Sequence, residues 1–569
     1  MLAAHRRIFR TLTFYHHIPA VHSMSTNTEK KIESEVARRR TFAIISHPDA
    51  GKTTLTEKLL LYGGAIHLAG SVKSRRAAKH AVSDWMELEK QRGISVTSSV
   101  LQFPYEEYAI NLLDTPGHAD FSEDTYRTLA AADSAVMLMD VAKGVEPQTI
   151  KLFKVCAMRK IPIFTFINKM DRWGRRPLEL MEEIEDILGI RSCPINWPIG
   201  MGNEFKGVYD RLNEKIILFD SAGRHGEAIL EEQTMSLDDP GAEKFLGHER
   251  YEQLLEDVEL LDIAGDPFDL ERVRQGELTP LFFGSAMTNF GVRPFLDAFV
   301  NMAPSPHDTR DRPIEPTRKD FSGFVFKIQA NMNPQHRDRL AFMRITSGVF
   351  KKDMQAKLLR SDREFKLAYP QQFMADDREM AEEAFAGDIV GLYDPGRFRI
   401  GDTIYTGEPV EETDIPRFSP EHFAVVEIKD ALKRKQLSKG LKQLSEEGTI
   451  QVFKQPKMGT LDVVVGAVGI LQFEVLKFRL EHEYNVNVEL RRLGFEHARW
   501  VEGDDFDEDA VNRADYAKVL RDRDDLPLVL FRNNWALNYI QQQYPGTKLL
   551  PNPPGTPGLQ ELHGSTHGF

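Results

Sequence analysis

A short segment near the N-terminus combines residue types that bind phosphate groups. Residues 41–45 form an apolar run, and SHPDAGKTT follows with the spacing GxxxxGK[ST], except that Ser46 replaces the first glycine. In such a loop, backbone N–H groups and the positive end of the next helix face the phosphates, while Lys52 contacts the β and γ phosphates. The predicted nucleotide contacts of this loop are Ser46, His47, Pro48, Asp49, Ala50, Gly51, Lys52, Thr53 and Thr54.

A second apolar run, residues 110–113, ends in the sequence DTPGH. A carboxylate at the tip of a strand beside a phosphate loop is suited to Mg²⁺, so we expect Asp114 to hold this ion together with the hydroxyl of Thr53. The N–H of Gly117 can contact a γ phosphate and sense its loss. The predicted nucleotide contacts here are Asp114, Thr115, Pro116, Gly117 and His118.

The sequence NKMD follows another apolar run, residues 161–167, and indicates guanine as the base. A carboxylate at Asp171 can accept hydrogen bonds from both N1–H and the 2-amino group of guanine, whereas adenine offers neither donor there. Asn168 can link the base to the phosphate loop, and the stem of Lys169 can cover the face of the base. We expect the whole segment, including Met170, to line the guanine site.

The elements that must position these residues are five apolar β runs, each followed by a segment with a ligand role. Besides the three runs above, residues 135–139 precede Asp140, and residues 281–283 precede a GSA segment whose Ser285 and Ala286 are expected to approach the guanine. Ligands of doubly wound α/β sheets bind outside the carboxyl ends of the strands. The pattern therefore predicts an α/β P-loop GTP-binding domain with a doubly wound, mostly parallel sheet.

Together, the segments SHPDAGKTT, DTPGHADF, DVAKGVEPQT, NKMD and GSAM resemble those of the translational GTPases. The segment EKQRGIS resembles the first switch of that family, so the resemblance implies Ser95 as a Mg²⁺ ligand, with Thr97 as the open alternative. It also implies that His118 orients the attacking water, while Lys52 and Gly117 assist hydrolysis at the phosphates. Slow intrinsic hydrolysis that the ribosome stimulates is expected.

The GTP-binding domain is expected to span residues 39–305, with an inserted subdomain at about 185–275. The interval between the NKMD and GSA segments is far longer than one helix and one strand require. The insertion resembles the subdomain shared by elongation factor G and peptide chain release factor three. An insertion of no set function is the alternative.

The following chain predicts two further domains. Short β runs broken by Gly-Asp turns indicate an antiparallel β-barrel in residues 306–412, preceded by a linker. Alternating strands and helices indicate an α+β domain in residues 413–543, which resembles domain three of elongation factor G. The segments DFSGFVFKIQANMNPQHRDRLAFMR, QLSEEG, VGAVGILQFEV and ARWVE closely resemble the bacterial-type release factor three family. A translocase of the elongation factor G type would need two more folded domains, which favours the release factor family.

A basic helix is expected at residues 432–444, with leucines on one face. Its other face could meet phosphates of ribosomal RNA, or it could be an ordinary solvated face. The cations concerned are Lys433, Arg434, Lys435, Lys439 and Lys442.

The resemblance implies a ribosome-dependent GTPase of translation termination, which uses GTP, GDP and Mg²⁺ and stimulates and recycles the codon-reading class one release factors. Its expected partners are those release factors and the ribosome, including ribosomal RNA near the GTPase-activating region, with neither a membrane nor DNA as a partner. Two alternatives stay open: another ribosomal GTPase of elongation or assembly, and a nucleotide-locked ribosome-binding scaffold.

Composition narrows the class of protein. The 569 residues carry a net charge of −13, which disfavours binding of nucleic acid through bulk positive charge, and the two cysteines rule out a disulfide framework. No apolar run approaches the roughly 18 residues of a membrane span. Residues 1–38 are expected to be a disordered or targeting extension, and residues 544–569 a disordered Pro/Gly-rich tail. A cytoplasmic location is expected, or an organellar one if residues 1–23 are a transit peptide.

Overall fold

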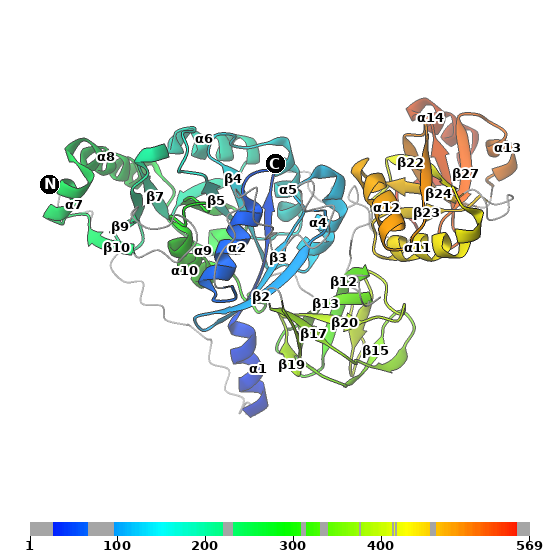
Figure 1. Ribbon diagram of the computed structural model, residues 1–569, viewed down its shortest axis with the longest axis horizontal. Coiled ribbons are helices and arrows are strands. Elements are labelled where there is room, and N and C mark those ends of the chain that lie inside the picture. The colour runs from blue at the N-terminus through cyan, green and yellow to red at the C-terminus, as the bar shows by residue number, and fades with distance from the viewer. Residues whose placement is uncertain are drawn as a thin grey trace.

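The computed structural model places three successive parts along the chain, with the C-terminal part set apart to one side (Figure 1). The residues that it describes are 27–66, 96–219, 232–308, 314–330, 339–374, 377–411, 415, 418–455, 463–503 and 505–554.

The first part is built on a seven-stranded sheet within the described residues. All neighbouring strands are parallel except β2, which runs antiparallel to β3, so the predicted doubly wound, mostly parallel sheet is confirmed. In spatial order the strands are β2 (Ser99–Tyr105), β3 (Tyr108–Asp114), β1 (Arg39–Ser46), β4 (Ser134–Asp140), β5 (Ile163–Asn168), β11 (Leu278–Phe283) and β6 (Arg191–Pro194).

Alternate side chains of the central strand β1 enter two different cores. Phe42 and Ile44 belong to one apolar cluster, while Ala43 and Ile45 belong to another. Because successive side chains of a strand point to opposite faces, the apolar run buries both faces of the sheet under helices. The helical elements of this part are α2 (Lys52–Tyr62), η1 (Ala119–Phe121), α4 (Ser122–Ala130), α5 (Pro147–Met158), α6 (Pro177–Leu188) and α10 (Val292–Met302).

The insertion forms its own four-stranded antiparallel sheet with helices beside it (Figure 1). It begins later than the expected residue 185, since α6 and β6 belong to the main domain and β6 pairs in parallel with β11. Its elements are β7 (Asn196–Ile199), η2 (Gly202–Glu204), β8 (Gly207–Asp210), β9 (Lys215–Phe219), β10 (Glu232–Ser236), α7 (Pro240–Leu246), α8 (His248–Ala264) and α9 (Leu270–Arg274).

The second part is antiparallel β structure, as predicted. Its described strands form a larger sheet in the order β16-β15-β21-β12-β13-β20-β17-β18 and a small β14-β19 pair. The strands are β12 (Ser322–Ala330), β13 (Arg339–Ser347), β14 (Val349–Lys351), β15 (Gln355–Leu358), β16 (Arg363–Lys366), β17 (Gln371–Met374), β18 (Asp377–Met380), β19 (Glu383–Phe385), β20 (Ile389–Tyr393) and β21 (Thr403–Tyr405).

The third part contains two four-stranded sheets, in the orders β23-β24-β22-β25 and β27-β28-β26-β29, which share an apolar cluster. The first sheet carries the predicted basic helix as α11. Its elements are β22 (His422–Ile428), η3 (Ala431–Lys433), α11 (Arg434–Glu446), β23 (Gln451–Phe453), β24 (Val463–Ala467), α12 (Leu471–His482) and β25 (Val488–Leu493). The second sheet comprises β26 (His497–Glu502), α13 (Glu508–Asn512), β27 (Ala517–Arg521), β28 (Pro527–Phe531), α14 (Asn534–Gln543) and β29 (Lys548–Leu550).

The structure differs from the sequence-based expectation at both ends. Helix α1 (Asn27–Ala37) lies within the expected extension 1–38, because Ile32 and Val36, one helical turn apart, pack into the core of the second part. Strand β29 lies within the expected tail 544–569, because it pairs with the distant strand β26. Residues 1–26 and 555–569 lie outside the described residues.

The first and second parts are joined by a buried ion pair. A guanidinium nitrogen of Arg344 on β13 lies 2.7 Å from a carboxylate oxygen of Asp133, and neither side chain is exposed. The same guanidinium and the hydroxyl of Thr41 donate to the carbonyl oxygen of Gly387. Buried charges need such pairing, so these contacts hold the two parts together. In the described part of the chain, no helix has the length and apolar character needed to cross a membrane.

Candidate functional site

The phosphate loop joins the end of β1 to the start of α2. Gly51, which precedes the helix, has φ of 98°, and a Cβ built there would lie 2.4 Å from Nδ2 of Asn168. The left-handed backbone and this close approach both require glycine. Helix α2 therefore begins at the carboxyl edge of the sheet, where the positive end of a helix favours anionic groups.

Lys52 and Asp114 meet at this edge. Nζ of Lys52 lies 2.5 Å from Oδ1 of Asp114, and their side chains are 8% and 2% exposed. The contact forms because β1 and β3 are parallel neighbours, with Ile44 in register with Asp114. Thr53, which follows Lys52, is half-buried at the start of α2. The structure thus places Lys52, Thr53 and Asp114, three of the residues predicted to hold phosphate or Mg²⁺, at the same edge of the sheet.

The DTPGH segment packs directly on the phosphate loop. The hydroxyl of Thr115 donates to the carbonyl oxygen of Ile44 at 2.6 Å. A Cβ at Gly117 would lie 3.5 Å from both the nitrogen of Pro48 and the carbonyl oxygen of Ser46. The DTPGH segment and the phosphate loop are therefore in close contact, so a movement of one would displace the other.

Asn168 and Lys169 of the NKMD segment hold the phosphate loop from its other side. The amide of Asn168 donates to the carbonyl oxygen of Ala50 at 2.8 Å, and its Oδ1 accepts from the backbone N–H of Ala286 at 2.9 Å. Nζ of Lys169 donates to the carbonyl oxygen of Asp49 at 2.5 Å. The three loops that were predicted to surround a guanine nucleotide are thus connected by hydrogen bonds.

Asp140 follows one of the five predicted strands, and its specific contact is visible only in the structure. Its Oδ2 lies 2.7 Å from Nζ of Lys169. Burial alone would raise the pKa of this carboxyl group, but the bond from Lys169 and the backbone N–H of Ala142 hold the pKa below its usual value. Its position at the end of β4, between two strands that bear ligand residues, was the available signal.

Asp171 and Ser285 lie together at the expected guanine end. The hydroxyl of Ser285 donates to Oδ1 of Asp171 at 2.6 Å. Met170 is buried, and its backbone N–H donates to the carbonyl oxygen of Gly284 at 3.1 Å. The bond from Ser285 fixes the carboxylate and leaves Oδ2 as a further acceptor.

His118 caps the short helix η1. Its Nδ1 accepts a hydrogen bond from the backbone N–H of Asp120 at 3.2 Å and lies 3.4 Å from Oδ1 of the same residue. The side chain is 36% exposed, and its ring centre lies 6.2 Å from that of Phe121. His118 is therefore accessible and immediately follows the residue that packs on the phosphate loop.

His47 has a different environment from His118. Its side chain is fully buried, and Nε2 lies 3.4 Å from a carboxylate oxygen of Glu146. Burial lowers the pKa of the ring, and Glu146 opposes this effect.

The predicted ligand Ser95, and the EKQRGIS segment that contains it, lie outside the described residues, whereas the alternative Thr97 is described and half-buried.

The chain matches three protein families, one for each part. Residues 37–305 match the family described as Elongation factor Tu GTP binding domain. Residues 320–407 match Elongation factor G domain 2, and residues 413–541 match Class II release factor RF3, C-terminal domain.

Curated relatives match nearly the whole chain. A protein named Peptide chain release factor 3 from Symbiobacterium thermophilum is 59% identical over 90% of this chain and 98% of its own length. One of the same name from the Cyanothece strain PCC 7425 is 53% identical over 94% of this chain and 99% of its own.

A crystal structure of a protein from Thermus thermophilus is similar in fold. It aligns with a TM-score of 0.66 over 82% of this chain and 71% of that chain, at 23% sequence identity. This likeness agrees with the arrangement described above.

Proposed function

Since this chain belongs to the peptide chain release factor 3 family and is a GTPase of translation termination, we propose that it acts on ribosomes that carry a codon-reading class one release factor. GTP binding promotes the departure of that factor after peptide release, and hydrolysis then frees this protein from the ribosome. The match of residues 413–541 to the C-terminal domain of class II release factor RF3 supports the termination role, and the convergence of Lys52, Asp114 and Asn168 at one phosphate loop supports its dependence on GTP.

The phosphates bind at the loop between β1 and α2. Backbone N–H groups and the positive end of α2 face them, and Lys52 shares its ammonium group between Asp114 and the β and γ phosphates. The backbone N–H of Gly117, held beside Pro48, contacts the γ phosphate. Loss of that phosphate on hydrolysis is thereby transmitted to the DTPGH segment.

The donors near Lys52 suit Mg²⁺, because hydroxyl and carboxylate oxygens are the hard ligands that this ion takes alongside phosphates and water. Thr53 and Asp114 would hold the ion, together with Ser95 or Thr97. When bound, Mg²⁺ neutralises charge on the phosphates.

Asp171 selects guanine. Its carboxylate accepts from N1–H and the 2-amino group, and the bond from Ser285 keeps it in place. Lys169, fixed by Asp140 and the loop carbonyl of Asp49, lays its stem against the base. Ser285 and Ala286 adjoin this end of the site, where the backbone N–H of Ala286 donates to Oδ1 of Asn168.

His118 orients the attacking water. Phosphoryl transfer requires little covalent help from the protein, so positioning and charge stabilisation supply most of the rate. His118 is exposed enough to reach water and follows directly on Gly117.

The exposed cations of α11 contact ribosomal RNA. Leu437, Leu441 and Leu444 are buried on one face of the helix, which supports the amphipathic pattern. The opposite face is basic in a chain of net charge −13, so binding to phosphates there would depend on this local surface rather than on the overall charge. The exposed cations are Arg434, Lys435, Lys439 and Lys442.

The decisive experiment measures GTP hydrolysis with termination complexes, with and without a codon-reading release factor. His118→Ala should abolish ribosome-stimulated hydrolysis and leave GTP binding nearly unchanged, because the ring is proposed to orient the attacking water and the phosphates are held by the loop and Lys52. Surviving turnover would disprove the assignment of His118. Equal ribosome-stimulated activity in elongation and termination complexes would favour a role in elongation.

A further inference from the structure

Helix α12 of the third part receives its N-terminal cap from the first part. The residue at its N-cap position, Ile470, has an apolar side chain and therefore cannot accept a hydrogen bond from the first N–H groups of the helix. Instead, Oδ2 of Asp120 accepts from the backbone N–H of Leu471 at 2.7 Å. An acidic group is favoured there because the N-terminus of a helix carries partial positive charge.

Gly469 makes this contact possible. A Cβ built there would lie 2.3 Å from both Cβ and Cγ of Asp120 and 2.4 Å from its Cα. The backbone of Gly469 is not in the left-handed region, so the absence of a side chain serves the close approach alone. Asp120 of the first part therefore packs directly against the backbone of Gly469 in the third part.

Asp120 is shared between α12 and His118. Its backbone N–H donates to Nδ1 of His118, while its carboxylate accepts from Leu471. Within the described residues, the polar contacts of the His118 ring are with Asp120. For the ring to swing away from η1, this capping bond must break while Asp120 is held by α12.

Apolar contacts extend the same connection. Phe121 in η1 and Val475 in α12 form a small buried cluster with Val96, the first described residue after the EKQRGIS segment. Helix α12 therefore contacts chain that adjoins both predicted switch segments.

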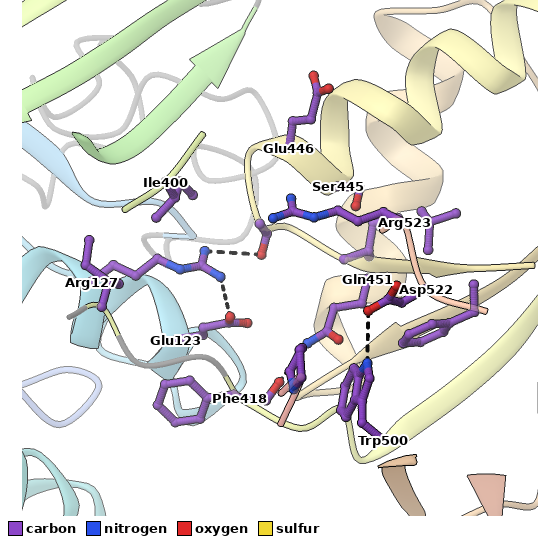
Figure 2. Close-up of a pocket in the computed structure, with 16 residues that line it drawn as sticks. Glu123, Arg127, Ile400, Phe418, Ser445, Glu446, Gln451, Trp500, Asp522 and Arg523 are labelled. Carbon is purple, nitrogen blue, oxygen red and sulfur yellow. Dashed lines mark hydrogen bonds and ion pairs between the residues drawn. The ribbon is translucent and has the colours of Figure 1, made fainter. Parts of the chain in front are cut away.

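The rest of this interface combines polar contacts with a small cavity. Figure 2 shows Arg127 of α4 facing the end of α11, and one of its guanidinium nitrogens lies 3.5 Å from the carbonyl oxygen of Gly448. A cavity of about 100 Å³ separates the parts here, and its lining includes Ile400 of the second part and Trp500 of the third. Separation of α12 from η1 also breaks polar contacts elsewhere in the interface, among them the ion pair of Arg339 with Glu446 and the bond from Arg479 of α12 to the carbonyl oxygen of Ala330.

We propose that Asp120 is a positioning residue through which the docked third part restrains His118, so that hydrolysis accelerates when α12 leaves Asp120. This inference rests on the proposed role of His118 in orienting water. The restraint is a population effect: the seated Asp120 favours the capped orientation of the ring, and release of α12 makes other orientations accessible.

Gly469→Ala tests the proposal from the third part, without altering the nucleotide site. The added methyl group collides with Asp120 and displaces α12. Intrinsic single-turnover hydrolysis at saturating GTP should rise about five-fold, the change that loss of one helix cap produces in an equilibrium. GTP affinity should stay unchanged, since no nucleotide contact is altered.

The matched control is Gly494→Ala, because a Cβ at Gly494 meets no atom within 4 Å. It should hydrolyse GTP like the wild type. An unchanged or slower rate in Gly469→Ala, with a normal melting temperature, would overturn the proposal.

Two further variants test whether the hydrogen bond from Leu471 to Asp120 restrains His118 or whether the Asp120 side chain only supports the local structure. Asp120→Ala should reproduce the acceleration, whereas Asp120→Asn keeps an acceptor for the N–H of Leu471 and should stay close to the wild-type rate. If Asp120→Asn accelerates as much as Asp120→Ala, the cap is not the cause and the proposal fails.

The double variant Gly469→Ala/His118→Ala distinguishes the two hypotheses. Loss of the gain in the double variant supports the route through His118, and its persistence overturns that route. Failure of the proposed function is a separate result, since it appears as ribosome-stimulated hydrolysis that survives in His118→Ala alone.

Discussion

Nζ of Lys52 and Oδ1 of Asp114 lie 2.5 Å apart at the carboxyl edge of the main sheet, one at the start of α2 and the other at the end of β3. Each was predicted to serve the phosphates or their metal ion, and each neutralises the other in this structure. Because both are buried, loss of either partner would leave an unpaired buried charge, so the pair bears on the stability of the domain as well as on its chemistry.

Lys52→Met should weaken both stability and nucleotide binding. Without nucleotide, the variant leaves the carboxylate of Asp114 buried and unpaired, so the free energy of unfolding should fall by about 3 kcal/mol. Affinity for GTP should fall about 10- to 100-fold with the loss of a charged donor. Denaturant unfolding and nucleotide titration check these values, with Lys151→Met on the exposed face of α5 as control. An unchanged GTP affinity would contradict the role of Lys52.

Asp171→Asn should change the base preference from guanine to xanthine. The variant loses the acceptor for N1–H and the 2-amino group, which should lower GTP affinity about 100-fold. Its amide can instead donate to the oxygen that xanthine carries at position 2. Competition between GTP and xanthosine triphosphate measures the change, and Asp186→Asn on α6 is the matched control. A variant that still prefers GTP would place the guanine contact elsewhere.

Arg344→Met should loosen the first part from the second. It removes the guanidinium that lies beside the fully buried carboxylate of Asp133, which costs about 3–5 kcal/mol of unfolding free energy. Chemical denaturation measures this loss. Arg491→Ala, which breaks the exposed pair with Glu427, should leave the transition in place. Equal effects of the two variants would show that burial does not decide the strength of these pairs.

The inserted subdomain should lose stability as pH rises toward neutrality. Burial is the main cause that raises the pKa of Glu232 from 4.5 to about 7, with Asp297 adding to the effect and Arg293 opposing it. Between these two values the folded form keeps a proton that the unfolded chain has released, so the free energy of unfolding decreases with rising pH.

Glu232→Gln checks this sign, because a neutral amide cannot titrate. Between about pH 4.5 and 7, the free energy of unfolding should decrease less with rising pH in the variant than in the wild type. Glu252→Gln, an exposed position on α8, should keep the wild-type slope. A steeper decrease of the free energy of unfolding in Glu232→Gln would contradict the predicted direction of this pH dependence.

Much of the fold was predictable because its signals are short-range. Each apolar run of the main sheet directly precedes its loop, so β1, β3 and β5 could be placed together with the residues that follow them. The predicted fold class and the release factor function are confirmed, whereas the individual ligand roles stay predictions. The tails were harder, since β29 is a strand only because β26 lies beside it.

The sequence by itself determined the family, the α/β fold of the first part and the composition of the nucleotide loops, because that chemistry lies within a few residues of each strand end. Only the tertiary structure decided that Asp120 caps α12 and that Arg344 neutralises Asp133. Each of these contacts joins residues far apart in the chain, and neither has a local pattern. Helix α12 has no capping side chain at Ile470, and Gly469 lets Asp120 of the first part approach its first N–H group. This cap depends on how the two parts dock, so no single segment of the sequence predicts it.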